Sequence, residues 1–266
     1  MSAFKRWRRR RLTRQPLTAE RLAMIVRNVP YYGILPPDQQ RELQGLVQVF
    51  LAEKPYEACG GLALTDEIRV TIAAQGCTLL LGRETEIYPK LRSILVYPHA
   101  FVANVTARQA DGTVLEGRQG RQGESWMQGY VVLSWDDVLA GAADIHDGRN
   151  VTLHEFAHQL DNESGAPEGA PLLEDPSLAG EWARVFGAEY RLLCEHVRDG
   201  RATLLDPYGT VSPAEFFAVC TEYFFERPVE LQAQHGELYR LLQRYYRQDP
   251  ALMMSAAHPV SDPTRA

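Results

Sequence analysis

Residues 151–161, Val-Thr-Leu-His-Glu-Phe-Ala-His-Gln-Leu-Asp, constrain what this chain can fold into more than any other segment. They contain the pattern His-Glu-x-x-His, in which His154 and His158 are four residues apart. On an α-helix this spacing brings both imidazoles to one face, about one turn apart, so both can reach a single cation. Glu155 then lies near enough to touch a water on that cation, as the general base of a zinc peptidase does. The segment therefore predicts a zinc site on a helix.

The same segment is predicted to be helical without reference to the motif. Its apolar residues recur at the spacing of one buried helix face, formed by Leu153, Phe156, Ala157 and Leu160. The two histidines and Asp161 repeat that spacing one residue further round. Asn150 is suited to the N-cap of this helix. A motif this short occurs by chance in about one such chain in a hundred, and the matching helix face favours a genuine metal site.

Basic residues are concentrated at the start of an otherwise acidic chain. The 266 residues carry a net charge of −6, but the first fourteen hold seven of the 28 Lys and Arg and no acidic residue. The remaining 21 basic and 34 acidic residues give the rest of the chain a net charge of −13. This leader could begin an export signal, contact nucleic acid or an anionic membrane, or be a solvated arm. The apolar stretch that follows, Leu22 to Val26, is too short for a signal core, and we expect an unstructured arm without a partner.

The composition indicates a cytoplasmic protein. No stretch approaches the roughly 20 apolar residues that span a membrane, so we expect no membrane partner, and the acidic body argues against nucleic acid. The cysteines are widely spaced, without a Cys-x-x-Cys pair, and are expected to be buried free thiols in a reducing compartment. They are Cys59, Cys77, Cys194 and Cys220.

Periodicity and turn residues predict an α+β fold with a small mixed sheet, one metal-binding helix and a mainly helical remainder. Helices are expected at 37–54, 65–75, 135–142, 151–161, 178–197, 213–225 and 236–247, and strands at 93–97, 113–116 and 130–134. With 45% hydrophobic residues the length fits one large domain. We divide the chain into a basic arm and lead-in (1–34), the domain (35–250) and a disordered tail (251–266).

The expected strand at 130–134 has two interpretations. In zinc peptidases of the zincin class, an edge strand just before the metal helix pairs with the extended substrate. The other interpretation is an interior strand without substrate contact, and the sequence pattern fits both.

Three carboxylates compete to be the third metal ligand. Asp161 shares the histidine face, but its short side chain would have to reach back about one turn, so a hydrogen bond to a ligand imidazole is easier. Glu215 and Glu222 lie seven residues apart, on one face of a later helix. Ser212-Pro-Ala-Glu215 is also a capping box, which by itself would explain Glu215. Glu222 lies among aromatic residues and needs a partner there, so spacing alone leaves Glu215 and Glu222 nearly even.

Several motifs together resemble the Mlc titration factor A family of zinc-dependent peptidases. They are His-Glu-Phe-Ala-His-Gln-Leu-Asp (154–161), Ser-Pro-Ala-Glu-Phe-Phe-Ala-Val-Cys-Thr-Glu-Tyr-Phe-Phe (212–225), Leu-Val-Tyr-Pro (95–98) and Ser-Trp-x-x-Gly (125–129). The similarity extends from about Leu35 to about Pro250 and leaves the arginine-rich leader outside it. The resemblance implies a zincin-like domain, similar to the catalytic core of anthrax lethal factor.

The resemblance also implies site residues and an activity. It places one zinc ion on His154, His158 and Glu215, makes Glu155 the general base, and makes Tyr208 a candidate donor to the oxyanion. It implies a cytoplasmic peptidase of aminopeptidase type acting on small peptide substrates, with a transcriptional repressor of the Mlc type as a partner. The rival interpretation is a regulatory protein that sequesters a transcription factor and uses zinc to hold its fold. Glu155 weighs against it, because a structural zinc site needs no general base.

Overall fold

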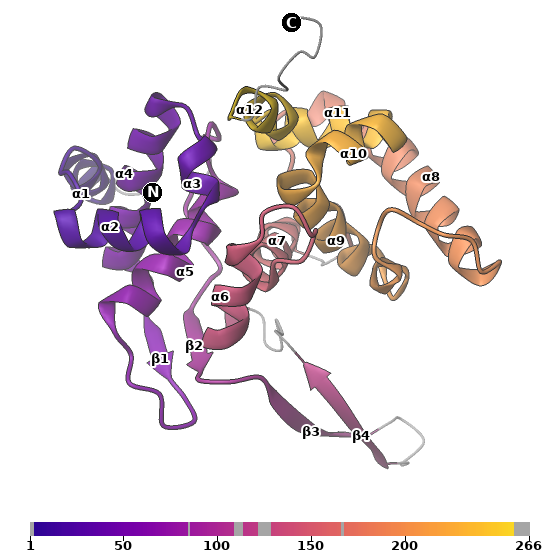
Figure 1. Cartoon of the computed structure of the whole chain (residues 1–266), viewed down its shortest axis with the longest axis horizontal. Helices are drawn as coiled ribbons and strands as arrows, with labels where there is room; N and C mark the ends of the chain where they lie inside the picture. The colour runs from indigo at the N-terminus through magenta and orange to yellow at the C-terminus, as the bar shows by residue number, and fades with distance from the viewer. Residues whose placement is uncertain (1–2, 85, 109–113, 122–128, 166–167, 258–266) are drawn as a thin grey trace, which may run out of the picture.

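The computed structural model of the chain describes residues 3–84, 86–108, 114–121, 129–165 and 168–257. The N-terminal helices lie together on one side of the molecule and α8–α11 on the other, with α7 between them and the strands below (Figure 1). The N-terminal half contains α1 (Ala3–Thr13), α2 (Ala19–Asn28), α3 (Tyr31–Ile34), α4 (Pro37–Glu53), α5 (Asp66–Thr78) and α6 (Trp135–Ala143). The C-terminal half contains α7 (Val151–Asp161), α8 (Ala179–Arg198), α9 (Pro213–Glu226), α10 (Pro228–Gln234), α11 (Gly236–Tyr246) and α12 (Pro250–Ala257). Three short 3₁₀ helices are η1 (Asn162–Ser164), η2 (Pro176–Leu178) and η3 (Pro207–Thr210).

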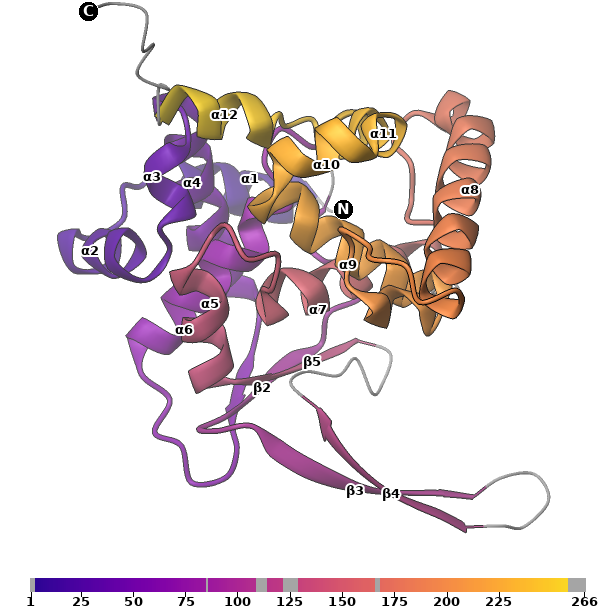
Figure 2. The ribbon, with the colours of Figure 1, turned by 45° about the vertical axis from the view of Figure 1, so that its right-hand side comes forward.

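The main sheet has three parallel strands in the order β1 (Tyr56–Ala58), β2 (Ser93–Tyr97) and β5 (Tyr130–Ser134). Helix α5 makes the crossover from β1 to β2, as parallel pairing requires. Strands β3 (Phe101–Arg108) and β4 (Val114–Arg121) form a separate antiparallel hairpin that projects from the body (Figure 2). The α+β prediction is therefore confirmed. The small sheet was predicted to be mixed, but its three strands are all parallel. The antiparallel pairing is confined to the hairpin, which is inserted in the chain between β2 and β5.

Helix α7 is the central element of the core. Its predicted apolar face is buried, and the Phe156 ring packs against Phe50 and Tyr88, with centroids 5.8 and 4.8 Å away. On α5, a Cβ added at Gly76 would lie 2.9 Å from the Phe156 ring, so the close approach of the two helices needs a glycine there. On its other side α7 packs along the aromatic helix α9. These contacts fix α7 from two sides.

Both ends of the chain differ from the sequence prediction. Residues 3–13 form helix α1 instead of an unstructured arm, because Arg9 pairs with Glu53 of α4 and Leu12 packs against the core. Residues 250–257, expected to belong mostly to a disordered tail, form α12, in which Ala251, Met253 and Met254 are buried. Residues 258–266 lie outside the described ranges.

Two further expectations concern the chain as a whole. The four cysteines are free thiols; Cys77 and Cys220 are buried as predicted, whereas Cys59 and Cys194 are only partly buried. Among the helices in the described ranges, none has both the length and the apolar character needed to cross a membrane.

Candidate metal centre

The start of α7 is fixed by Asn150, the predicted N-cap. Its side-chain oxygen accepts a hydrogen bond from the Leu153 N–H at 3.0 Å, and its amide donates to the Gly141 carbonyl at 3.0 Å. The Asn150 backbone N–H in turn donates to Glu222 Oε1 at 2.8 Å. One residue therefore ties the helix that carries both histidines to α6 and to α9.

The start of α9 directs Glu215 towards α7. Ser212 is the N-cap and accepts from the Glu215 N–H at 3.2 Å, with Pro213 at the first helical position. The capping-box interpretation is thus correct for the serine. The Glu215 carboxylate, however, contacts the two imidazoles of α7.

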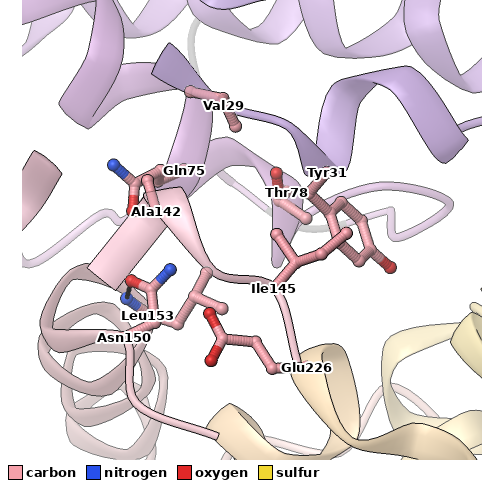
Figure 3. A pocket seen from close by; sticks show the side chains of 9 residues that line it. All are labelled: Val29, Tyr31, Gln75, Thr78, Ala142, Ile145, Asn150, Leu153 and Glu226. Atoms are coloured by element: carbon pink, nitrogen blue, oxygen red, sulfur yellow. Dashed lines mark hydrogen bonds between the residues drawn. The ribbon is translucent and has the colours of Figure 1, made fainter. Parts of the chain in front are cut away.

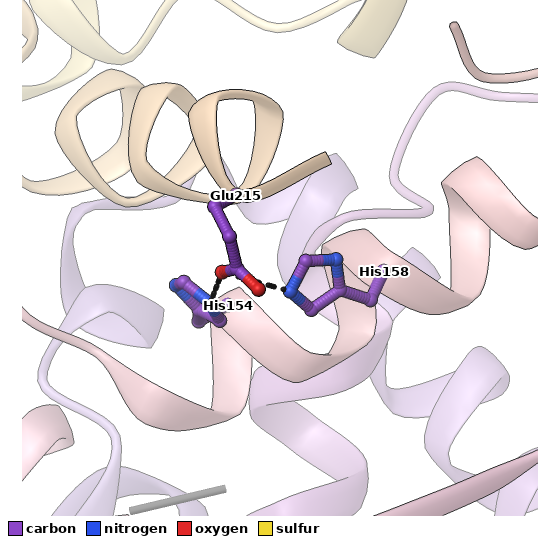
Figure 4. A group of neighbouring side chains, drawn as sticks. All are labelled: His154, His158 and Glu215. Atoms are coloured by element: carbon purple, nitrogen blue, oxygen red, sulfur yellow. Dashed lines mark hydrogen bonds and ion pairs between the residues drawn. The ribbon is translucent and has the colours of Figure 1, made fainter. Parts of the chain in front are cut away.

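His154, His158 and Glu215 converge on one point (Figure 4). Glu215 Oε2 lies 3.0 Å from His154 Nε2 and 3.3 Å from His158 Nε2, and one ligand atom from each residue lies within 4.8 Å of the other two. Neighbouring ligands of a tetrahedral zinc ion, with bonds of about 2.0–2.2 Å, are about 3.3–3.6 Å apart. The 3.3 Å separation lies in this range and the 3.0 Å separation is slightly shorter, so two imidazole nitrogens and one carboxylate oxygen form a donor set that suits such an ion. No other group of three His, Cys, Asp or Glu in the described ranges gathers in this way.

Glu222 lies on the opposite side of His154. Its Oε2 is 2.9 Å from His154 Nδ1, while its Oε1 accepts the Asn150 N–H. The expectation that this acid needs a partner is therefore met, and the partner is His154. A carboxylate at Nδ1 holds the proton on that nitrogen and leaves Nε2 available for a metal.

The charges of the site are strongly coupled. Burial lowers the pKa of His154, but the carboxylates of Glu222 and Glu215 raise it by more. The net result is a pKa well above the usual value of a histidine. Burial raises the pKa of Glu215, but the two histidines lower it more, so this carboxylate is ionised at neutral pH. Burial also raises the pKa of Glu155, which the nearby histidines only partly offset. The site thus holds an anionic candidate ligand and, beside it, a carboxylate whose pKa is shifted towards neutrality.

The two predicted catalytic residues lie near this cluster but differ in exposure. Glu155 is buried, and its Oε2 has no hydrogen-bond partner among the described residues. Tyr208, in η3, is 53% exposed, and its ring centroid lies 6.1 Å from that of His154. One buried acceptor and one accessible phenol therefore border the three candidate ligands.

Asp161 makes a different contact from the one expected. Its Oδ2 accepts the Gly169 N–H at 2.8 Å, and no hydrogen bond to an imidazole is found for it in the described part of the chain. Gly169 has φ +71°, and a Cβ added there would lie 2.3 Å from the Pro213 carbonyl oxygen. Asp161 therefore links the end of α7 to the loop against the start of α9. The sequence indicates that Gly169 lies in a loop after the motif, but not that this glycine contacts the start of α9.

A small cavity lies beside the N-terminus of α7 (Figure 3), and none of the three candidate ligands lines it. Its volume is about 20 Å³, and its lining includes Asn150, Leu153, Gln75 and Glu226. Glu226 is 2% exposed, and burial raises its pKa to about 9. Sequence reasoning also missed this residue, which follows Glu222 by one helical turn. The cavity has room for about one water molecule, so it is not a substrate cleft.

Comparison with known proteins identifies the family. A sequence profile of the glucose-regulated metallo-peptidase M90 family matches residues 4–247. The chain belongs to the M90 metallo-peptidase family. An uncharacterized protein of Synechocystis sp. is 41% identical over 249 residues, covering 92% of this chain and 90% of its own length. Mlc titration factor A of Pectobacterium atrosepticum and of Klebsiella pneumoniae are each 33% identical, covering 84% of both chains.

The M90 match confirms the resemblance and extends it. It begins at residue 4, so it includes the basic leader that the motifs alone had left outside. Membership makes the chain a metallo-peptidase of zincin-like fold, and the cluster in Figure 4 is where its described residues fit a metal. Of the motif at 125–129, Gly129 alone lies within the described ranges.

Proposed function

We propose that this chain is a zinc-dependent peptidase and that His154, His158 and Glu215 hold one zinc ion. The observation that carries the proposal is the position of Glu215 Oε2, 3.0 and 3.3 Å from the two imidazole nitrogens. Three protein ligands leave a fourth position for water or substrate, as in catalytic rather than structural zinc sites. The family is one of metallo-peptidases, which agrees with this donor set.

The remaining residues are assigned roles by their positions. Zinc, when bound, polarises the scissile carbonyl and lowers the pKa of water towards about 7. Glu155, with its raised pKa and unpaired Oε2, accepts the proton of the attacking water and delivers it to the leaving amine. Tyr208 donates a hydrogen bond to the oxyanion that develops on the carbonyl oxygen. Glu222 keeps the His154 ring in its ligand orientation.

The substrate is proposed to be a small peptide, cleaved in aminopeptidase fashion. Strand β5 is one of the two end strands of the main sheet in the described chain and is the one that contacts α7, so an extended substrate can pair with its outer edge. The aminopeptidase assignment rests on the family resemblance. Matched peptides with free and acetylated amino termini test it, because an aminopeptidase cleaves the free form alone.

Glu155→Gln is the direct test of the mechanism. The variant should bind zinc as the wild type does and lose at least about 1000-fold in kcat/KM, because Gln cannot accept the proton. Glu168→Gln, an exposed acid in the loop after α7, is the matched control and should keep wild-type activity. Zinc content and hydrolysis of a peptide panel are measured for all three proteins. A fully active Glu155→Gln would remove the general-base role.

A second function is suggested by the name of the relatives. Mlc titration factor A is named for a partner, and we propose that this chain also binds a transcriptional repressor of the Mlc type, in the cytoplasm. A regulatory protein with structural zinc would bind that repressor equally well with Glu155→Gln and show no hydrolysis in either form. Repressor affinity, measured with and without a chelator, separates a capture surface from binding that depends on the zinc site.

A further inference from the structure

Helix α1 has an inner and an outer face of opposite character. The inner face packs on α4: Arg9 donates two hydrogen bonds to Glu53, at 2.8 and 2.6 Å, and Lys5 lies 3.8 Å from the same carboxylate. Leu12, one helical turn further along this face, packs against the core. A Cβ added at Gly45 of α4 would lie 3.2 Å from Thr13, so the two helices approach closely. The orientation of α1 is therefore fixed.

The outer face carries exposed aromatic and basic side chains, which are Phe4, Arg6, Trp7, Arg8, Arg10 and Arg11. Phe4 is 71% exposed and Trp7 57% exposed, although large apolar side chains are usually mostly buried. Their rings stack with centroids 6.1 Å apart, and the Arg11 guanidinium lies 5.9 Å from the Trp7 ring. The four arginines of this face form no ion pair with the described residues.

We propose that the outer face of α1 binds an anionic membrane surface. In helices that lie in the interface of a bilayer, aromatic rings lie at the acyl boundary and basic side chains around them reach the lipid phosphates. Beyond residue 14 the chain has a net charge of −13, so an anionic surface attracts α1 and repels the rest. This association is peripheral, and it revises the expectation of a solvated arm without a partner.

Nucleic acid is the other anionic surface, and the outer face fits it less well. Bases bind a protein by stacking on free aromatic faces. Here Phe4 and Arg11 lie against the Trp7 ring, which reduces the face left for a base. A phosphate backbone would leave the exposed apolar area of Phe4 and Trp7 without a favourable partner, whereas a bilayer buries it.

Co-sedimentation with vesicles tests the proposal. The full chain should bind vesicles of phosphatidylcholine mixed with phosphatidylglycerol, and bind phosphatidylcholine alone weakly. Replacing Arg8 and Arg11 together by Gln should lower the partition coefficient about tenfold or more, and higher salt should weaken wild-type binding. Replacing Phe4 and Trp7 together by Ala should lower the partition coefficient about tenfold.

Matched controls use exposed residues elsewhere. Arg41→Gln with Arg240→Gln removes two exposed charges, and Leu172→Ala with Leu252→Ala removes two exposed apolar side chains. Both control pairs should bind anionic vesicles as the wild type does, and circular dichroism checks that every variant is folded. The proposal is overturned if the wild type does not sediment with anionic vesicles. It is equally overturned if the control pairs weaken binding as much as the α1 pairs do, or if the chain binds single-stranded DNA but not vesicles.

Discussion

His154 has a carboxylate at each ring nitrogen, and the two carboxylates have different roles. Glu215 approaches Nε2 together with the second histidine, whereas Glu222 approaches Nδ1 and also holds the Asn150 N–H. Spacing alone could not separate these roles, because both glutamates lie on one face of α9. The difference arises from where α7 crosses α9, which is a property of tertiary packing.

Glu226, one turn after Glu222, makes folding depend on pH. Its pKa is raised by burial from 4.5 to about 9, so between these values the folded chain holds a proton that the unfolded chain has lost. Folding therefore takes up a proton, and the free energy of unfolding falls as pH rises through this window. One such group contributes a slope of up to about 1.4 kcal/mol per pH unit.

Replacing Glu226 by Gln should remove this slope. The difference in the free energy of unfolding between the variant and the wild type should change in favour of the variant by up to about 2.5 kcal/mol as the pH rises from about 6 to about 8. Urea denaturation of both proteins measures the difference, with a chelator present so that metal binding does not contribute. Other titrating groups, such as Glu163, are common to both proteins and cancel. A stability difference that is the same at both pH values would show that Glu226 is ionised in the folded chain.

The pairing of α7 with α9 depends on the loop between α7 and α8. Asp161 at the end of α7 accepts the Gly169 N–H, and the Trp182 indole donates to the Gly169 carbonyl at 3.0 Å. Gly169 in turn lies against Pro213, two residues before Glu215. The loop therefore helps to fix the position of Glu215, the third candidate ligand.

Gly169→Ala should destabilise the chain and weaken metal binding. The added Cβ would lie 2.3 Å from the Pro213 carbonyl oxygen at a positive φ, and we expect a loss of roughly 2–4 kcal/mol. Gly165→Ala is the matched control, since Gly165 also has a positive φ but no atom lies within 4 Å of its added Cβ. The control should lose about 1–2 kcal/mol. Thermal denaturation of both variants measures the difference, and equal losses would show that the contact with Pro213 can relax.

Elements that depend on local sequence were predictable. The N-caps Asn150 and Ser212 and the strands at 93–97 and 130–134 are where the residue patterns place them. Helices α1 and α12 were not, because their stability comes from contacts with distant segments. The inner face of α1 includes Lys5 and Arg9, which look like solvated residues until Glu53 is known to lie opposite them.

At the scale of the whole molecule, the site joins two helices that are distant in sequence. His154 on α7 and Glu215 on α9 are 61 positions apart, and each helix is held by its own N-cap and aromatic contacts. The two histidines could be proposed as ligands from the sequence because they share one helix. Spacing left the third ligand open among Asp161, Glu215 and Glu222, and only the family resemblance pointed to Glu215, because which carboxylate reaches the imidazoles depends on how α7 and α9 pack.

The central claim is that Glu215 completes a zinc site whose His154 is oriented by Glu222. The most direct test is zinc bound per chain, measured in zinc-buffered solution for the wild type, Glu222→Gln and Glu215→Gln. We predict one zinc per wild-type chain, an affinity about 10–100-fold weaker for Glu222→Gln, and a larger loss for Glu215→Gln. If Glu215→Gln binds zinc as tightly as the wild type, Glu215 is not a ligand and the account is contradicted.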